Sequence, residues 1–144
     1  MLPATRKYKP DFNQLVRVFR REIPDRPVLF EYFMNGDIFS MVTGRPFASL
    51  TSGTEMIKDI IESFYRLGYD YATIPARYLD SFSFEPPGHE RKETISLNDG
   101  AIITSVADFG SYPWPDPEKC NYGILDEIAE LIPEGMKLII SGPG

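Results

Sequence analysis

The sequence is poor in the residues that build disulfides and zinc sites. It has one cysteine, Cys120, and one histidine, His89, among 144 residues. A single cysteine excludes an internal disulfide and favours a reducing compartment, and the two residues together do not supply the four ligands of a structural zinc site. The chain also lacks an apolar run near the roughly 18 residues that a membrane helix needs, and its first ten residues lack the apolar stretch of a secretory signal. We therefore expect a soluble, cytoplasmic protein with no membrane partner.

Positive charge is also scarce. The sequence has 15 Lys and Arg residues against 21 Asp and Glu residues, which gives a formal net charge of −6. An acidic chain repels the phosphate backbone, so nucleic acid is not an expected partner. A chain of this size buries roughly two-thirds of its unfolded surface when it folds, which is enough for the core of one domain.

Hydrophobic periodicity predicts helices that alternate with short buried strands. Tight apolar runs bounded by proline or glycine are typical of strands, and stripes at a spacing of three and four are typical of helices. A strand, a helix, a short turn and a second strand form a βαβ unit, whose strands are parallel. The expected helices are residues 11–21 (with Asp11 as the N-cap), 36–42 (ended by Gly44), 52 or 54 to 67 (ended by Gly68) and 117–131 (with Asp116 as the N-cap), and the expected strands are residues 28–33, 71–74 and 136–140.

One part of the chain departs from this alternation. Residues 76–92 show no periodicity, and residues 94–97 and 101–106 flank an Asn-Asp-Gly turn. Asp-Gly is a favoured pair in β-hairpin turns. We therefore expect residues 76–107 to form a loop and hairpin excursion, and residues 1–10 to form a loose lead-in.

Two folds agree with three parallel strands. One is a small three-stranded α/β domain whose own helices cover the sheet. The other is the opening part of a TIM (β/α)8 barrel, a fold that takes about 250 residues. We prefer the partial barrel, because a lone three-stranded parallel sheet exposes two edges and much of one face. In that interpretation residues 1–144 supply the first three parallel strands with their helices and an inserted β-hairpin.

Four segments carry a family resemblance. They are residues 26–30, which follow a proline pair into the first expected strand; residues 67–72, where a helix meets the second strand; residues 112–116, with the sequence Tyr-Pro-Trp-Pro-Asp after the expected hairpin; and residues 133–144, where Pro-Glu-Gly leads into the last strand and its glycine-rich exit. Together they resemble the N-terminal part of the uroporphyrinogen decarboxylase superfamily, which also contains cobalamin-dependent methyltransferases that act on methylated corrinoid proteins. The resemblance implies a TIM barrel whose active site lies at the carboxyl ends of the strands, where barrel enzymes gather their chemistry.

The residues that follow the expected strands are therefore the candidates for substrate binding. Asn35 and Asp37 follow the first strand, Arg77 and Tyr78 follow the second, and Ser141 follows the third. Arg77 needs a polar partner after a buried strand, either a substrate or a carboxylate in a surface salt bridge. Asn35 and Asp37 have the alternative role of capping the next helix, since both residue types are favoured helix caps. The sequence indicates no catalytic residue in this chain.

The resemblance distinguishes two activities. The decarboxylases carry an arginine-rich motif after the first strand that grips the carboxylates of a tetrapyrrole, a task that suits guanidinium groups. Residues 32–37 contain no arginine, and Arg77 stands about where the decarboxylases place an aspartate. These differences from the decarboxylase pattern favour the methyltransferase branch. The alternative is a tetrapyrrole decarboxylase that binds the substrate carboxylates in a different way.

In the methyltransferase branch a zinc-bound thiolate accepts the methyl group, since zinc deprotonates a bound thiol. The resemblance places the zinc ligands in the second half of the barrel, outside this chain, and names a corrinoid protein as the partner. We therefore expect this segment alone to be inactive. A third hypothesis is a non-catalytic binding module, whose exposed strand edges would favour a homodimer.

Overall fold

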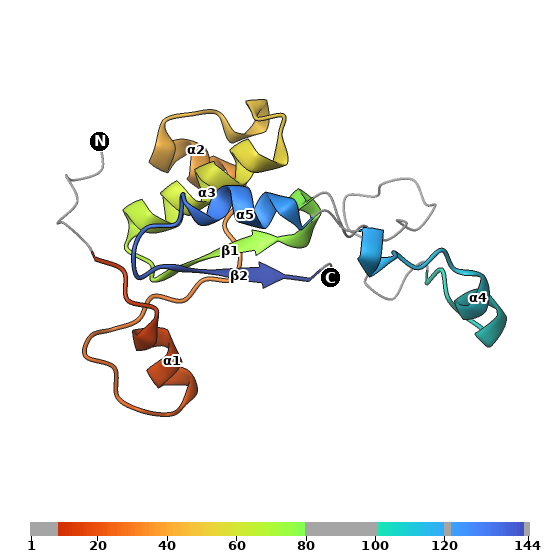
Figure 1. Cartoon of the computed structure of the whole chain (residues 1–144), viewed down its shortest axis with the longest axis horizontal. Coiled ribbons are helices and arrows are strands. Elements are labelled where there is room, and N and C mark those ends of the chain that lie inside the picture. The colour runs from red at the N-terminus through yellow and green to blue at the C-terminus, as the bar shows by residue number, and fades with distance from the viewer. Residues whose placement is uncertain (1–8, 80–100, 120–121, 143–144) are drawn as a thin grey trace.

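The computed structural model describes residues 9–79, 101–119 and 122–142 of the chain (Figure 1). Helices and strands are mixed along these ranges, which confirms the predicted α/β class. None of the helices found there is long and apolar enough to cross a membrane. The elements are α1 (Asn13–Phe19), α2 (Gly36–Thr43), a 3-10 turn (Phe47–Ser49), α3 (Gly53–Leu67), β1 (Tyr71–Pro75), a 3-10 turn (Ala76–Leu79), α4 (Val106–Ser111), a 3-10 turn (Pro117–Lys119), α5 (Gly123–Ala129) and β2 (Lys137–Ser141).

The sheet of the described residues consists of β1 and β2, which pair in parallel. Tyr71 lies opposite Lys137 at one end, and Pro75 lies opposite Ser141 at the other. The chain passes through α5 between the two strands, as a parallel pair requires, and α3 and α5 lie together on one side of the sheet (Figure 1). Two of the three predicted strands, residues 71–74 and 136–140, are thus confirmed: β1 ends one residue later than predicted, and β2 begins and ends one residue later.

Helix α3 is the element that the sequence predicts best. The Ser52 hydroxyl accepts a hydrogen bond from the Glu55 N–H at 3.1 Å, so the first turn is capped by a side chain. Gly68 ends the helix in the left-handed conformation. The apolar stripe packs against β1 and α5, and it is almost completely buried at Ile57, Ile60, Ile61 and Phe64.

Residues 28–33, the first predicted strand, form no strand in the structure, so that prediction is wrong. The Glu31 N–H donates to the Tyr71 hydroxyl at 2.6 Å, and the same hydroxyl donates to the Glu31 carbonyl at 2.8 Å. The Phe30 ring lies 5.8 Å from the Tyr71 ring between centroids. The Tyr71 side chain therefore binds the Glu31 backbone at a place where a neighbouring strand would otherwise pair with it.

The predicted second arm of the hairpin, residues 101–106, is also wrong. Ser105 instead begins α4, because its hydroxyl accepts from the Asp108 N–H at 3.1 Å and its own N–H donates to the Asp108 carboxylate at 2.9 Å. This reciprocal capping box is encoded by a serine and an acidic residue three positions apart. The first arm, residues 94–97, and the turn at residues 98–100 lie outside the described residues.

Both predicted Asp-capped helices begin later than expected. The Asp11 carboxylate accepts from the Asn13 N–H at 3.1 Å, but the N-cap position of α1 belongs to Phe12. Asp116 accepts from the Glu118 N–H at 3.1 Å and begins only a 3-10 turn, while α5 starts at Gly123. In each case the aspartate orders one turn, and the helix follows after it.

A buried carboxylate anchors the amino end of β1. Asp70 is 1% exposed, and its Oδ1 accepts from the Asp11 N–H at 2.7 Å and from the Arg26 guanidinium at 2.5 Å. The Asp70 carbonyl accepts from the Lys137 N–H at 3.3 Å, next to the start of β2. Asp70 thus connects two segments to the amino end of the sheet. Asp11 belongs to the segment before α1, and Arg26 belongs to the segment after α1.

We expect Asp70→Asn to lower the free energy of unfolding by about 2 kcal/mol, because it removes a buried charge-assisted hydrogen bond and leaves Arg26 without its carboxylate. Urea denaturation followed by circular dichroism measures the change. Glu134→Gln is the control, since Glu134 meets Lys9 in an exposed ion pair at 3.6 Å that contributes little. An equal effect of both substitutions would contradict the anchoring role of Asp70.

Gly135 supports the same end of the sheet. Its φ is +84°, and a Cβ placed there would lie 2.1 Å from the Pro10 carbonyl oxygen. The Gly135 carbonyl accepts from the Phe12 N–H at 2.9 Å, so the lead into β2 and the lead into α1 are in direct backbone contact.

We expect Gly135→Ala to be more damaging than Gly44→Ala. Gly44 also has a positive φ, +76°, but open space around it, so alanine there costs only about 1 kcal/mol of backbone strain. At Gly135 the collision with Pro10 adds about 1–3 kcal/mol. Urea midpoints compare the two variants, and equal losses of stability would show that the backbone contact at Gly135 is unimportant.

Candidate functional site

The carboxyl ends of β1 and β2 lie at one edge of the sheet, where Pro75 stands opposite Ser141. Ligand sites of parallel α/β proteins gather at this edge. Ser141 is 3% exposed, and its hydroxyl lies 3.5 Å from the Ile74 carbonyl to which it donates. This predicted site residue therefore lies at the expected edge and faces β1.

Asn35 and Asp37 belong to the start of α2. The Asn35 carboxamide oxygen accepts from the Ile38 N–H at 3.0 Å, so Asn35 has the capping role that the sequence analysis named as its alternative. Asp37 is exposed in the first turn, where a negative charge interacts favourably with the helix dipole. Both residues are explained by the local needs of the helix.

Arg77 and Tyr78 lie in the 3-10 turn that directly follows β1. The Tyr78 ring contacts Phe47, with 6.3 Å between centroids, and Phe47 contacts Phe39 of α2 at 4.9 Å. Gly53 packs against the Tyr78 backbone so closely that a Cβ on it would lie 2.3 Å from the Tyr78 carbonyl oxygen. The turn after β1 is thus held between α2 and the start of α3.

A small cavity of about 40 Å³ lies beside this turn. Among the predicted site residues, Tyr78 lines this cavity, and Asn35, Asp37 and Ser141 do not. Its walls are mostly aromatic and aliphatic. The lining residues are Tyr32, Phe33, Met34, Phe39, Ile60, Thr73, Pro75 and Tyr78.

Thr73 is the residue of this cavity that the sequence analysis missed. It is 4% exposed in the middle of β1, and its hydroxyl has no hydrogen-bond partner within the described part of the chain. A buried hydroxyl is almost always paired, and leaving one unpaired costs about 1–3 kcal/mol. In the sequence, the signal for Thr73 was that it is a polar residue inside the apolar run of residues 71–74. From sequence alone, however, a threonine in such a run looks like an ordinary β-branched strand residue.

Charged side chains gather at another place, between the end of α2 and α3. The Arg45 guanidinium donates to the buried Asp59 carboxylate at 2.8 Å and also pairs with Glu62, which in turn pairs with Arg66. The hydrogen bond to Asp59 raises the pKa of Arg45. These arginines are bound by carboxylates of the protein itself, so the cluster joins two helices and has no evident affinity for an acidic substrate.

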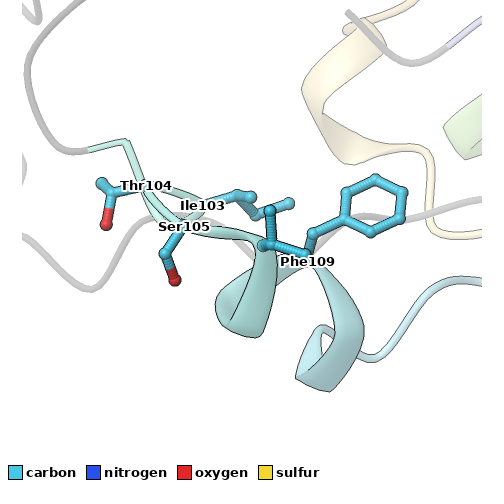
Figure 2. A pocket seen from close by; sticks show the side chains of 5 residues that line it. Ile103, Thr104, Ser105 and Phe109 are labelled. Carbon is cyan, nitrogen blue, oxygen red and sulfur yellow. The ribbon is translucent and has the colours of Figure 1, made fainter.

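A second hollow, of about 500 Å³ and wide open, lies on α4 (Figure 2). Ile103 and Phe109 extend to one side of it, away from the hydroxyls of Thr104 and Ser105. Both hydroxyls are already bonded to Asp108, at 2.9 Å and 3.1 Å. Among the described residues this hollow offers mainly apolar contact, and its two hydroxyls are already bonded, so the cavity at Thr73 is the better candidate.

No cluster of three His, Cys, Asp or Glu side chains in residues 9–79, 101–119 and 122–142 is placed to hold a metal ion. Comparison with known proteins finds no matching family model, no matching curated protein and no matching solved structure.

Tyr71 makes a pH-dependent contribution to stability. Its burial raises the pKa of the phenol above the ordinary value of 10.0, and the hydrogen bond to the Glu31 backbone opposes that shift only in part. The unfolded chain therefore loses this proton at a lower pH than the folded chain. It follows that stability is retained below about pH 10 and falls as the pH rises from there through the folded pKa.

We expect Tyr71→Phe to make this alkaline loss of stability shallower. At pH 7 the same variant is less stable by about 1–2 kcal/mol, because two hydrogen bonds to Glu31 are lost. Urea denaturation at several pH values from 7 to 11 measures both effects. Tyr65→Phe, at a more exposed position of α3, is the control, and an unchanged alkaline slope in Tyr71→Phe would contradict the account.

Proposed function

We propose that this chain is the N-terminal segment of a uroporphyrinogen decarboxylase-superfamily barrel, and that the full protein is a corrinoid-dependent methyltransferase-like enzyme. The observation that carries the proposal is the parallel β1–α5–β2 unit, with α3 packed on the same side of the sheet as α5. Consecutive parallel strands with helices on their outer side are the repeating unit of a TIM barrel.

The exposure of the sheet supports a larger barrel. Ile140 of β2 is 41% exposed, and the run next to β1 exposes Leu29, Phe30 and Phe33 by 46%, 59% and 64%. A sheet of two strands is marginal by itself in water and needs further strands or helices to cover it. In the proposal β1 and β2 are neighbouring barrel strands, and other parts of the barrel cover these apolar side chains.

The distribution of charge favours the methyltransferase branch. A tetrapyrrole carries several carboxylates, and its binding calls for arginines that are free to pair with them. Arg26, Arg45 and Arg66 all have protein carboxylates as partners, and the described residues that line the cavity beside β1 are neutral. These observations do not favour the tetrapyrrole decarboxylase.

The role proposed for this segment is to bind and orient the substrate. Tyr78 and Ser141 lie at or beside the edge where β1 and β2 end, and Arg77 follows the same strand. Positioning of this kind lowers the entropic cost of reaction without supplying a nucleophile. Zinc and a corrinoid protein would supply the methyl-transfer chemistry when bound, and the family resemblance places the zinc ligands in the second half of the barrel.

The proposal is tested by two assays on the full-length protein. The first mixes it with a methylated corrinoid protein and a thiol, and follows the methylated thiol by mass spectrometry. The second adds uroporphyrinogen and follows the loss of carboxylates. We expect methyl transfer and no decarboxylation. Decarboxylation would support the alternative branch, and a complete lack of both reactions would contradict an enzymatic role.

We expect Arg77→Gln in the full-length protein to lower kcat/KM for methyl transfer about tenfold or more, because a charge-assisted hydrogen bond to the substrate contributes about 1.5–3 kcal/mol. Arg20→Gln, at an exposed position after α1, is the matched control. If both variants keep the original kcat/KM, Arg77 forms a surface salt bridge and does not bind the substrate.

A further inference from the structure

We propose that α4 and the segment that follows it form a docking surface for a basic protein segment that carries apolar side chains. This α4 surface is defined by the exposed residues Ile102, Val106, Phe109 and Trp114. The inference does not rest on the proposed methyl transfer. It rests on the exposure of these side chains, on the contacts that hold them in place and on the negative charge among them.

Large apolar side chains of the α4 surface face solvent. Val106 is 90% exposed, Phe109 is 56% exposed and Trp114 is 47% exposed. The helix stands apart from the sheet and from α3 and α5, so those elements do not cover it (Figure 1). Val106 and Phe109 also line the wide-open hollow of about 500 Å³ (Figure 2). Neighbouring exposed apolar side chains of this kind mark protein-interaction sites, where aromatic residues are enriched.

The aromatic side chains of this surface are held by local contacts. The Trp114 indole N–H donates to the Phe109 carbonyl at 3.0 Å, and the two rings lie 4.8 Å apart between centroids. The Tyr112 ring contacts Trp114 from another position, also at 4.8 Å. The capping box of Ser105 and Asp108 fixes the first turn of the helix below them. Because these side chains are already ordered, a partner that binds them pays little further conformational entropy.

The charge of this part of the chain selects a basic partner. Its acidic residues are Asp108, Asp116 and Glu118, and its basic residue is Lys119, which pairs with Asp116 at 3.3 Å. Hydrogen bonds from Thr104 lower the pKa of Asp108 below its ordinary value, so this carboxylate is ionised at neutral pH. The net charge of the whole chain, −6, acts in the same direction. An arginine or lysine of the partner pairs with these carboxylates and is also attracted to the face of an indole such as that of Trp114.

Two other occupants fit the α4 surface less well. Anionic membranes attract proteins through clusters of several lysines and arginines, whereas residues 101–119 contain one lysine and three acidic residues. A second copy of the chain brings the same acidic residues to the contact, and like charges placed together oppose association. A basic segment with apolar side chains is the occupant that satisfies both the apolar surface and its charge.

Trp114 makes the proposal directly measurable, because it is the single tryptophan of the chain. The probe is a peptide of about 14 leucine and lysine residues with the leucines on one helix face, added to the full chain. We expect the fluorescence of Trp114 to shift to shorter wavelength and to saturate. A peptide with glutamate in place of lysine binds at least tenfold more weakly, and one with serine in place of leucine causes no shift. Equal binding of the lysine and glutamate peptides, or no binding of the lysine peptide, would overturn the proposal.

Substitutions assign the binding to α4. We expect Val106→Ser to weaken binding of the leucine–lysine peptide about fivefold, because the valine side chain is buried by the partner. Val106 is almost fully exposed in the free chain, so the variant remains folded, as a thermal melt shows. Val18→Ser makes the same change at an exposed position of α1 and is the control. Equal binding by the two variants would show that the peptide does not bind α4.

A second pair of variants tests the charge. We expect Asp108→Asn, which keeps the shape of the side chain, to weaken peptide binding about threefold, the effect of one exposed charge. Asp126→Asn, at an exposed position in the first turn of α5, is the control. Circular dichroism checks that α4 is retained in Asp108→Asn. Unchanged binding by this variant would contradict the role of its charge.

The same fluorescence signal distinguishes the other occupants. We expect vesicles of phosphatidylglycerol to leave the emission of Trp114 unchanged, and we expect the emission of the chain alone to be independent of its concentration. A shift to shorter wavelength with the vesicles would assign the α4 surface to a membrane. A shift that appears as the chain is concentrated would assign it to a second copy. Either result would overturn the proposal.

Discussion

The parallel pairing of β1 with β2 is the constraint on which the rest of the structure depends. Because both strands run in the same direction, the residues before them meet at one edge of the sheet and the residues after them meet at the other. Asp70 and Gly135 hold the first edge together through a buried carboxylate and a backbone contact. Tyr78 and Ser141 are placed at the second edge by the same pairing. One strand register thus separates the end that stabilises the fold from the end that offers a site.

The buried charges of the described residues are paired within the protein. The buried carboxylates Asp59 and Asp70 are both bound by arginines, as buried charges must be if they are not to destabilise the fold. The described residues around the cavity beside β1 are neutral, and in the described part of the chain the buried Thr73 hydroxyl among them has no hydrogen-bond partner. Unpaired buried hydroxyls are rare in folded proteins, so Thr73 is the exception to this pattern among the described residues.

Local signals in the sequence were sufficient for the elements that the chain stabilises locally. The cap at Ser52 and the stop at Gly68 define α3, and the apolar runs at β1 and β2 identify two strands. Residues 28–33 look like a strand for the same reason, but the Glu31 backbone among them is bound by the Tyr71 side chain, a long-range contact that no local pattern reveals. Strand direction was sufficient to place Tyr78 and Ser141 at the carboxyl edge of the sheet. Thr73 was not, because whether a buried hydroxyl is paired depends on neighbours from several elements.

The central claim is the parallel register, and nuclear Overhauser effects between the backbones of β1 and β2 test it most directly. The structure predicts contacts between Tyr71 and Lys137 at one end and between Ile74 and Ile140 at the other. Contacts between Tyr71 and Ile140 would indicate antiparallel strands. That result would separate Ser141 from the turn after β1, and it would contradict both the site and the proposed barrel.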